Sequence, residues 1–138
     1  MAHGSRIGSV VIFVQNLDRS VNFYRELLAL DVVDRSPTAA LLLSSDGCQL
    51  ILRAMGASVV HTLGAVGVQY VIWTAADEED LDRCERVLKE FSAHTETRSG
   101  GPARAVEGRD PDDIVVMITY PGPDELPLHE LPVRIYGW

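Results

Sequence analysis

The feature that most constrains how this chain folds is an order of segments that occurs twice. Residues 8–15 (GSVVIFVQ) are apolar and β-branched, which indicates a buried strand. The next segment predicts an amphipathic helix, which Asn16 or Asp18 is placed to cap. The apolar positions of this helix recur at helical spacing at Leu17, Val21, Tyr24 and Leu28. Three short runs separated by turn residues then predict antiparallel strands at 31–36, 39–44 and 48–53.

The second half of the chain repeats this order after a weakly patterned linker at residues 54–66. A strand is predicted at 67–74, and a helix at 77–91 begins with acidic residues, as the helix dipole prefers. Three more strands are predicted at 93–98, 103–109 and 114–120. The repeat has a period of about 60 residues, from Ser9 to Gln69, so we expect an α+β protein of two βαβββ modules.

Length and composition limit the partners of the chain. Its 138 residues, 46% of them hydrophobic, suit a single domain with one core. The net charge of −8, from 20 acidic and 12 basic residues, disfavours nucleic acid, whose binding needs clustered Lys and Arg. No apolar run approaches the roughly 20 residues of a membrane span, and the N-terminus lacks the apolar core of a signal peptide. We therefore expect a cytoplasmic protein that binds neither nucleic acid nor a membrane.

The two cysteines agree with that compartment. Cys84 shares a helical face with Leu81 and Leu88, and Cys48 alternates with apolar residues on a predicted strand. Because there is no CxxC spacing, we expect two buried reduced thiols in preference to a disulfide or a metal-binding pair.

The C-terminal segment differs in composition from the rest of the chain. Residues 121–138 contain four prolines and end in the apolar residues Val133, Ile135, Tyr136 and Trp138. Such an arm is expected to pack on the body of the protein or on a partner subunit. We thus expect one domain over residues 1–138, with module one at about 7–53, the linker, module two at about 67–120, and this arm.

Two segments, VVIFVQNLDRSVNFYRELLAL and GRDPDDIVVMI, carry a resemblance to a known family. The most specific pieces are Asn16-Leu17-Asp18 followed by Phe23-Tyr24 and Leu27-Leu28, and the turn Asp110-Pro111-Asp112 before an apolar strand. At these separations the chain resembles, over residues 7–120, the vicinal-oxygen-chelate superfamily of glyoxalase I, extradiol dioxygenases and bleomycin-resistance proteins. The resemblance implies two βαβββ modules that form a curved mixed sheet around a cleft. It also implies a homodimer, in which each cleft often uses strands from both chains.

The resemblance also implies where a metal ion would bind, and there the chain departs from the superfamily. The superfamily's metalloenzymes carry His and Glu ligands at positions that correspond here to Ser9, Ile51, Gln69 and Met117. A divalent cation needs imidazole, carboxylate or thiolate donors, which these residues do not supply, and a shift of one residue supplies none either. The other histidines, His61, His94 and His129, are scattered along the sequence. We therefore expect no metal ion and no cofactor.

Strand alternation applied to the resemblance predicts which side chains line the cleft. The predicted lining is mostly apolar with scattered polar groups, which suits an organic ligand held by a few hydrogen bonds. Trp73 could stack on a ring, Met117 could adapt to an irregular shape, and Arg53 could hold a carboxylate. Core packing explains Trp73 equally well and is slightly favoured for Met117, and a solvent-exposed strand end is favoured for Arg53. The lining comprises Ser9, Val11, Phe13, Gln49, Ile51, Arg53, Gln69, Val71, Trp73, Val115, Met117 and Thr119.

Several functions remain open from the sequence. The first is a metal-free protein that binds a small, mostly apolar or aromatic metabolite for sequestration or self-resistance, and the acidic surface favours a cationic one. The second is a cofactor-free cyclase, isomerase or lyase that acts on a natural-product intermediate, with Asp34, Tyr70, Glu96 and Glu107 as acid–base candidates that the pattern does not place. A metal-dependent lyase or dioxygenase and a purely structural role complete the alternatives. Binding is favoured over catalysis because no set of nucleophile, base and orienting group is legible.

Overall fold

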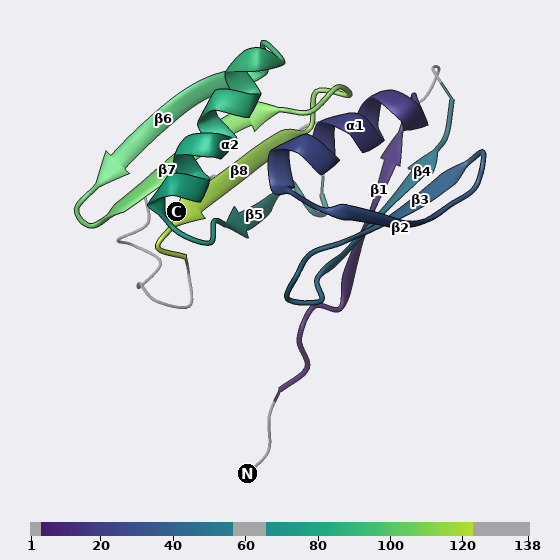
Figure 1. The fold of residues 1–138 in the computed structure, drawn as a ribbon, viewed down its shortest axis with the longest axis horizontal. Coiled ribbons are helices and arrows are strands. Elements are labelled where there is room, and N and C mark those ends of the chain that lie inside the picture. Colours follow the sequence, from purple (N-terminus) through teal and green to yellow (C-terminus); the bar gives the residue numbers. More distant parts are fainter. Residues whose placement is uncertain (1–3, 57–65, 123–138) are drawn as a thin grey trace. The chain divides into compact units, whose positions relative to one another are not determined.

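The computed structural model describes residues 4–56 and 66–122, and it divides into two compact units, Met1–Val60 and His61–Trp138 (Figure 1). Each unit contains one four-stranded mixed sheet and one helix, so the predicted α+β fold of two βαβββ modules is confirmed. The first unit runs β1 (Ser9–Val14), α1 (Leu17–Leu28), β2 (Asp31–Arg35), β3 (Ala39–Leu43) and β4 (Gln49–Ala54). The second runs β5 (Val71–Thr74), α2 (Glu78–Glu90), β6 (His94–Gly100), β7 (Ala103–Arg109) and β8 (Val115–Tyr120).

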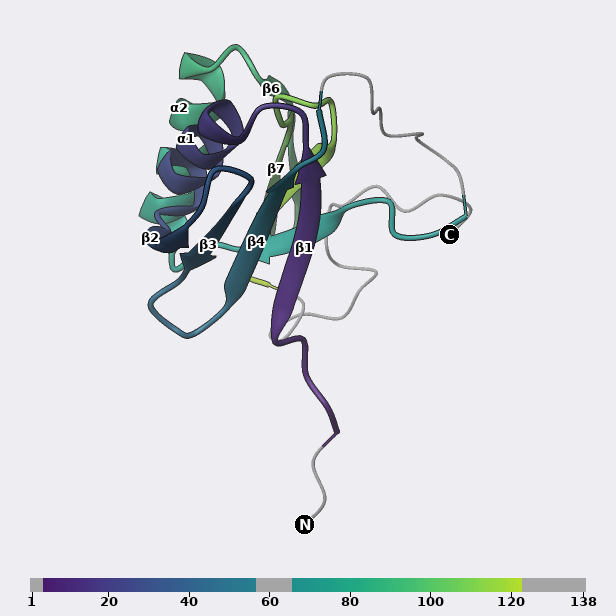
Figure 2. The same cartoon turned by 90° about the vertical axis from the view of Figure 1, so that its right-hand side faces the viewer.

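In the first unit the strand order is β1-β4-β3-β2, and only the β1–β4 pair is parallel. Asn16 caps α1, because its side chain accepts a hydrogen bond from Arg19 N at 3.0 Å. Of the two capping residues that the sequence allows, the structure therefore selects Asn16. Helix α1 lies along one side of the sheet (Figure 2), and the core between them is fully buried. That core contains Val21, Phe23, Tyr24, Leu27, Leu42, Leu50 and Leu52.

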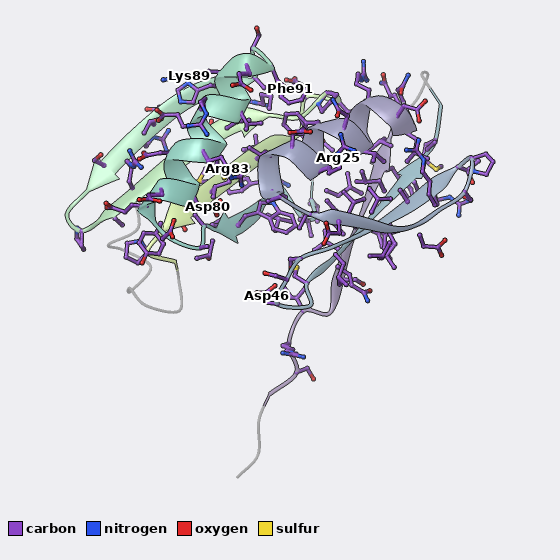
Figure 3. The ribbon with its side chains drawn as sticks, in the orientation of Figure 1. Arg25, Asp46, Asp80, Arg83, Lys89 and Phe91 are labelled. Atoms are coloured by element: carbon purple, nitrogen blue, oxygen red, sulfur yellow. The ribbon has the colours of Figure 1, made fainter. Side chains whose placement is uncertain are left out.

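The second unit repeats this arrangement with the strand order β5-β8-β7-β6, and β5 is parallel to β8. Asp77 caps α2 by accepting a hydrogen bond from Asp80 N at 2.7 Å, and acidic residues fill the first turn. On the same helix Asp80 also forms an ion pair with Arg83 at 2.9 Å (Figure 3). Leu81 and Leu88 are fully buried, together with Val106 and Ile118 of the sheet.

Three contacts show which face of the second sheet lies against α2. Arg104 forms an ion pair with Asp82 of the helix, and Thr97 donates a hydrogen bond to Glu85 at 2.5 Å. A Cβ atom placed on Gly108 would lie 2.8 Å from the Leu88 side chain. Arg104, Thr97 and Gly108 therefore mark the helix side, and the residues that alternate with them point to the opposite side.

The expected strand at residues 67–74 is shorter in the structure. It begins only at Val71, where pairing with Val116 of β8 starts. Gly67 has φ of +132°, which is outside the range of a regular strand. The segment between Gly67 and Val71 is therefore a lead-in to β5. The other predicted strands and both helices are confirmed to within two residues at each end.

The hairpin between β7 and β8 depends on one aspartate. Asp110 Oδ1 accepts hydrogen bonds from Asp112 N at 2.8 Å and Ile114 N at 2.9 Å, which closes the turn that the sequence predicts. Asp113 follows with φ of +67°, a left-handed conformation that Asp tolerates better than most residues. This turn fixes the register of β7 against β8.

Two other sequence expectations concern thiols and membranes. Cys84 is buried and Cys48 half-buried, both are free thiols, and burial raises the pKa of Cys84 to about 11. Within residues 4–56 and 66–122, no helix is long and apolar enough to cross a membrane. The linker from residue 57 to 65 and the arm from residue 123 lie outside the described residues.

The close approach of Gly108 to α2 makes a stability prediction. Replacing Gly108 with Ala would place a Cβ 2.7 Å from Ala93 O, a backbone atom, and should lower the free energy of unfolding by about 2 kcal/mol. Urea unfolding followed by circular dichroism measures this change. Gly8→Ala is the control, because nothing lies within 4 Å of its added Cβ, and it should change stability by less than about 0.5 kcal/mol. Equal changes in the two variants would contradict the packing described above.

Candidate functional site

The first unit presents an open sheet face on the side away from α1. The register places Ser9, Val11 and Phe13 of β1 beside Gln49, Ile51 and Arg53 of β4, in that order. Their neighbours in alternation, such as Leu50 and Leu52, are fully buried toward α1. Val11 is 56% exposed and Phe13 is 54% exposed. The six side chains that the sequence groups on this face therefore do share it, and two large apolar ones are accessible.

A hollow of about 260 Å³ lies on the same unit, over β2, β3 and β4. Of the predicted lining residues it includes only Gln49 and Ile51. Asp34, one of the four acid–base candidates, also lines it and accepts a hydrogen bond from Arg35 N at 2.8 Å. Arg35 in turn forms an ion pair with Asp18 at the start of α1. The hollow is therefore a shallow depression with one carboxylate and one guanidinium at its edge.

In the second unit the structure corrects one grouping. The sequence placed Val71 and Trp73 on one face with Val115, Met117 and Thr119. In the observed register Val71 pairs with Val116 and Trp73 with Ile118, so these two β5 residues lie on the helix side. Met117 is paired with Ile72 instead. The cause is that strand alternation alone leaves a shift of one residue undetermined, and such a shift moves every side chain to the other face.

In the second unit, the sheet face away from α2 combines apolar and polar residues that are buried in the chain. Met117 is paired with Ile72 on one side and with Glu107 of β7 on the other. Thr119 lies opposite Thr74 and Ala105. Met117 is 1% exposed, Thr119 is 0% exposed and Glu107 is 5% exposed. Gln69 precedes β5 and donates a hydrogen bond to Gly67 O at 3.1 Å, outside the paired strand.

Three of the four acid–base candidates come together here, around Arg98. Glu96 forms an ion pair with Arg98 at 2.6 Å, and Thr95 donates a hydrogen bond to Glu107 Oε2 at 3.2 Å. The pKa of Arg98 is raised, chiefly by the hydrogen bond to Glu96 and less by the charges of Glu107 and Tyr70. Glu96, Glu107 and Tyr70 therefore interact electrostatically with one cation, whereas Asp34 belongs to the other unit.

Thr119 carries a buried polar atom that stands out in this face. Its Oγ1 is buried and forms no hydrogen bond, as judged for the part of the chain that the structure describes. A buried hydroxyl without a partner destabilises a fold by about 1–3 kcal/mol, so such groups usually have a further role. The position of Glu107 could have been predicted from the sequence. Counting residues outward from the predicted Asp110 turn pairs Glu107 with Met117, which places both side chains on the same face of the sheet.

The positions at which the superfamily's metalloenzymes carry metal ligands hold no such ligands in this chain. Ser9, Ile51 and Met117, at three of the superfamily's ligand positions, supply neither imidazole nor carboxylate, and Gln69 at the fourth is an amide. Within residues 4–56 and 66–122, no group of three or more His, Cys, Asp or Glu side chains could hold a metal ion. The residues present therefore do not fit the metal centre of the superfamily's metalloenzymes.

His94, the histidine of β6, is engaged elsewhere. Its Nε2 lies 2.7 Å from Thr97 Oγ1, and Thr97 donates its single hydroxyl proton to Glu85. His94 Nε2 must therefore be the donor to Thr97, which assigns the proton to that nitrogen. Because Thr97 and Glu85 lie on the helix side, His94 belongs to the contact between β6 and α2. His61 and His129 lie outside the described residues.

A family model decides the relationship of the chain. The model of the Glyoxalase/Bleomycin resistance protein/Dioxygenase superfamily matches residues 6–118. The chain belongs to this superfamily. The match covers both modules and confirms the relationship that the helix and turn segments predict.

Solved structures agree with this assignment. A glyoxylase/bleomycin resistance protein/dioxygenase domain from Frankia sp. EAN1pec is 23% identical with a TM-score of 0.75, covering 85% of this chain and 92% of that one. A glyoxalase/dioxygenase from Nostoc punctiforme is 19% identical with a TM-score of 0.72, covering 83% and 89%. The fosfomycin resistance protein FosX from Mesorhizobium loti is 15% identical with a TM-score of 0.67, covering 91% and 98%. At these identities the likeness concerns the fold, and no curated protein matches the chain.

The buried hydroxyl of Thr119 makes the second prediction. Thr119→Val should raise the free energy of unfolding by about 1 kcal/mol, because it replaces a buried hydroxyl that has no partner with a methyl group of the same size. Thr97→Val is the matched control and should lower it by about 1 kcal/mol, since Thr97 bonds Glu85 and His94. Chemical unfolding of the two variants gives both values. A loss of stability in Thr119→Val equal to that of the control would show that the hydroxyl is satisfied in solution.

Proposed function

We propose that this protein binds a small, mostly apolar or aromatic molecule on the open sheet face of its first unit, without a metal ion. The observation that carries the proposal is the open face of the first unit, where Val11 and Phe13 are more than half exposed beside Ile51. Contiguous exposed apolar side chains on a sheet usually mark a surface that binds something. Members of the superfamily bind small molecules, which makes a ligand the natural occupant.

The residues proposed to contact the ligand follow the observed faces. On the first unit they are the predicted set, with Gln49 and Arg53 as polar ends of an apolar stripe. On the second unit Ile72 replaces Val71 and Trp73, because Ile72 shares the face of Met117. The proposed contacts of the first unit are Ser9, Val11, Phe13, Gln49, Ile51 and Arg53. Taken by itself, the second unit groups Ile72, Val115, Met117 and Thr119 on one sheet face.

A cofactor-free enzyme is the second candidate, and one observation favours it. Glu107 is a carboxylate that is 5% exposed on the second unit's sheet face away from α2, where it accepts a hydrogen bond from the Thr95 hydroxyl. A buried carboxylate near a bound molecule can accept or return a proton in a cyclisation, an isomerisation or an elimination. Glu107 can equally hold a ligand by hydrogen bonding. Binding alone does not require that the carboxylate be aligned with a reacting atom, as catalysis does.

One experiment separates the binder from the enzyme. The purified protein is incubated with a small-molecule extract of its source, and mass spectrometry compares the bound compound before and after incubation. A compound that is retained with unchanged mass and retention time supports sequestration. A compound that is released with an altered mass or retention time supports the enzyme, and failure to retain any compound counts against both. The homodimer implied by the superfamily remains a proposal, tested by the mass of the protein in solution.

Loss of the metal donors predicts how binding responds to metals. Protein without an affinity tag, incubated with Zn²⁺, Mn²⁺, Ni²⁺ or Fe²⁺ and then desalted, should retain less than about 0.1 ion per chain. Binding of the neutral fluorescent probe N-phenyl-1-naphthylamine should be the same within about twofold with and without EDTA. Close to one ion per chain, with probe binding lost in EDTA, would contradict the metal-free proposal.

Two phenylalanines in the first unit separate ligand binding from stability. Phe13→Ala should weaken binding of the probe about fivefold and lower the free energy of unfolding by less than about 1 kcal/mol, because Phe13 is already half in solvent. Phe23→Ala is the control: Phe23 is 1% exposed, and its truncation should cost about 3–5 kcal/mol. Fluorescence titration and urea unfolding give the two values. A Phe13→Ala variant that binds the probe as tightly as the wild type would remove this face from the site.

A further inference from the structure

A β-bulge in β2 turns one carboxylate onto the open face of the first unit. Val32 pairs with Leu42 of β3, but Asp34 pairs with Leu41, so Val33 is an extra residue in the strand. Leu42 is fully buried toward α1, and Leu41 lies on the opposite face. Without the extra residue, Asp34 would share the face of Val32 and point toward α1. Bulges often redirect a side chain next to a functional site, and this one places Asp34 on the face proposed to bind the ligand.

The pairing of the four strands sets Asp34 at the end of a row of side chains that crosses the sheet. Leu41 pairs with Ile51 of β4, and Ile51 pairs with Val11 of β1. Three apolar side chains, starting from the edge strand β1, therefore precede the carboxylate on the other edge strand, β2. Three strand spacings of about 4.8 Å make this row about 14 Å long. A molecule lying along the row would meet apolar surface over most of its length and a negative charge at one end.

A hollow lies at the Asp34 end of this row. Its volume is about 260 Å³, and its lining includes Asp34, Leu41 and Ile51, together with Gln49. Pockets that enclose a whole drug-sized ligand have volumes of about 300–1,000 Å³. The hollow is therefore suited to one end of a molecule whose remainder extends over Ile51 toward Val11.

The charges around the hollow leave Asp34 as a carboxylate that a cation can reach. Its Oδ1 accepts a hydrogen bond from Arg35 N at 2.8 Å, a neutral backbone donor that does not cancel the charge. The Arg35 side chain forms an ion pair with Asp18 of α1, and Arg35 pairs with Ala40 on the helix side. Among the described residues Asp34 is exposed and forms no ion pair. Arg53 shares the open face but does not line the hollow.

We propose that Asp34 pairs with a protonated amine at one end of the ligand, while the apolar remainder lies over Leu41, Ile51 and Val11. This inference rests on the proposed binding function and names its ligand class, an apolar or aromatic body with an ammonium group at one end. An alkylammonium, with a pKa of about 10 as in lysine, is charged at pH 7 and has three N–H donors for the carboxylate. The net charge of −8 attracts such a cation from solution.

Three probes with the same ring test this pairing: 2-(2-naphthyl)ethylamine, 2-(2-naphthyl)ethanol and 2-naphthylacetate. Ligand-observed NMR at pH 7 and low salt gives their affinities. The wild-type protein should bind the amine about fourfold more tightly than the alcohol, and the acetate most weakly, because an exposed ion pair contributes a few-fold at most. In 1 M NaCl the ratio of amine to alcohol affinity should fall to within about 1.5-fold, since the Debye length is then about 3 Å.

Two substitutions on the same strand separate the contact from the general charge of the protein. Asp34→Asn should give amine and alcohol the same affinity within about 1.5-fold and leave the affinity for the alcohol unchanged. Asp31→Asn is the matched control, because Asp31 is exposed, pairs with Leu43 on the same face and does not line the hollow. This variant should keep a ratio of about threefold or more. Both residues are exposed on an edge strand, so both variants should fold.

The outcomes distinguish the amine pairing from the binding function on which it rests. Equal binding of amine and alcohol by the wild type, a preference that survives Asp34→Asn, or an equal loss of preference in Asp31→Asn would overturn the pairing and leave the binding function standing. Tighter binding of the acetate would also overturn it and would indicate Arg53 as the charged contact. If none of the three probes binds, both the pairing and the binding function are refuted.

Discussion

The close packing of Gly108 against Leu88 is the constraint on which the interpretation of the second unit depends. A side chain at residue 108 would collide with the Leu88 side chain and with Ala93 O, so the strand can approach the helix only at a glycine. Because side chains alternate between the two faces of a strand, this contact decides the face of each residue in β7. Paired residues share a face, so the assignment extends to β8, β6 and β5. Which residues are available to a ligand follows from that single contact.

The elements themselves could be predicted from the sequence because their signals are local. Helical spacing of apolar residues, capping by Asn16 and Asp77, and the Asp110 turn each act within a few residues of chain. The sheet face on which each side chain of an edge strand lies has no such local signal, because it depends on the register against a partner strand about 45 residues away. The sequence therefore predicts a strand that includes β5 but assigns Trp73 to the wrong face.

The two sheets carry different kinds of side chain on the faces away from their helices. The first unit offers exposed apolar surface at Val11 and Phe13, and it explains why a hydrophobic molecule would be held. The sheet of the second unit carries a buried carboxylate, Glu107, and a buried hydroxyl, Thr119, on the face away from α2. Among residues 4–56 and 66–122, no three His, Cys, Asp or Glu side chains gather on either face in a way that could hold a metal ion. The chain thus has the fold of the superfamily, while Ser9, Ile51, Gln69 and Met117 stand at the positions of its metal ligands.

Which residues of the second sheet face α2 is tested most directly by nuclear Overhauser effects in the folded protein. Selective methyl labelling would report which protons lie within about 5 Å of the Leu88 methyl groups. The structure predicts strong effects from Leu88 to the Hα protons of Gly108 and none to the Met117 methyl, which lies on the opposite face. Effects between Leu88 and the Met117 methyl, with none to Gly108, would place Glu107 and Thr119 against the helix and contradict the assignment of residues to the two faces.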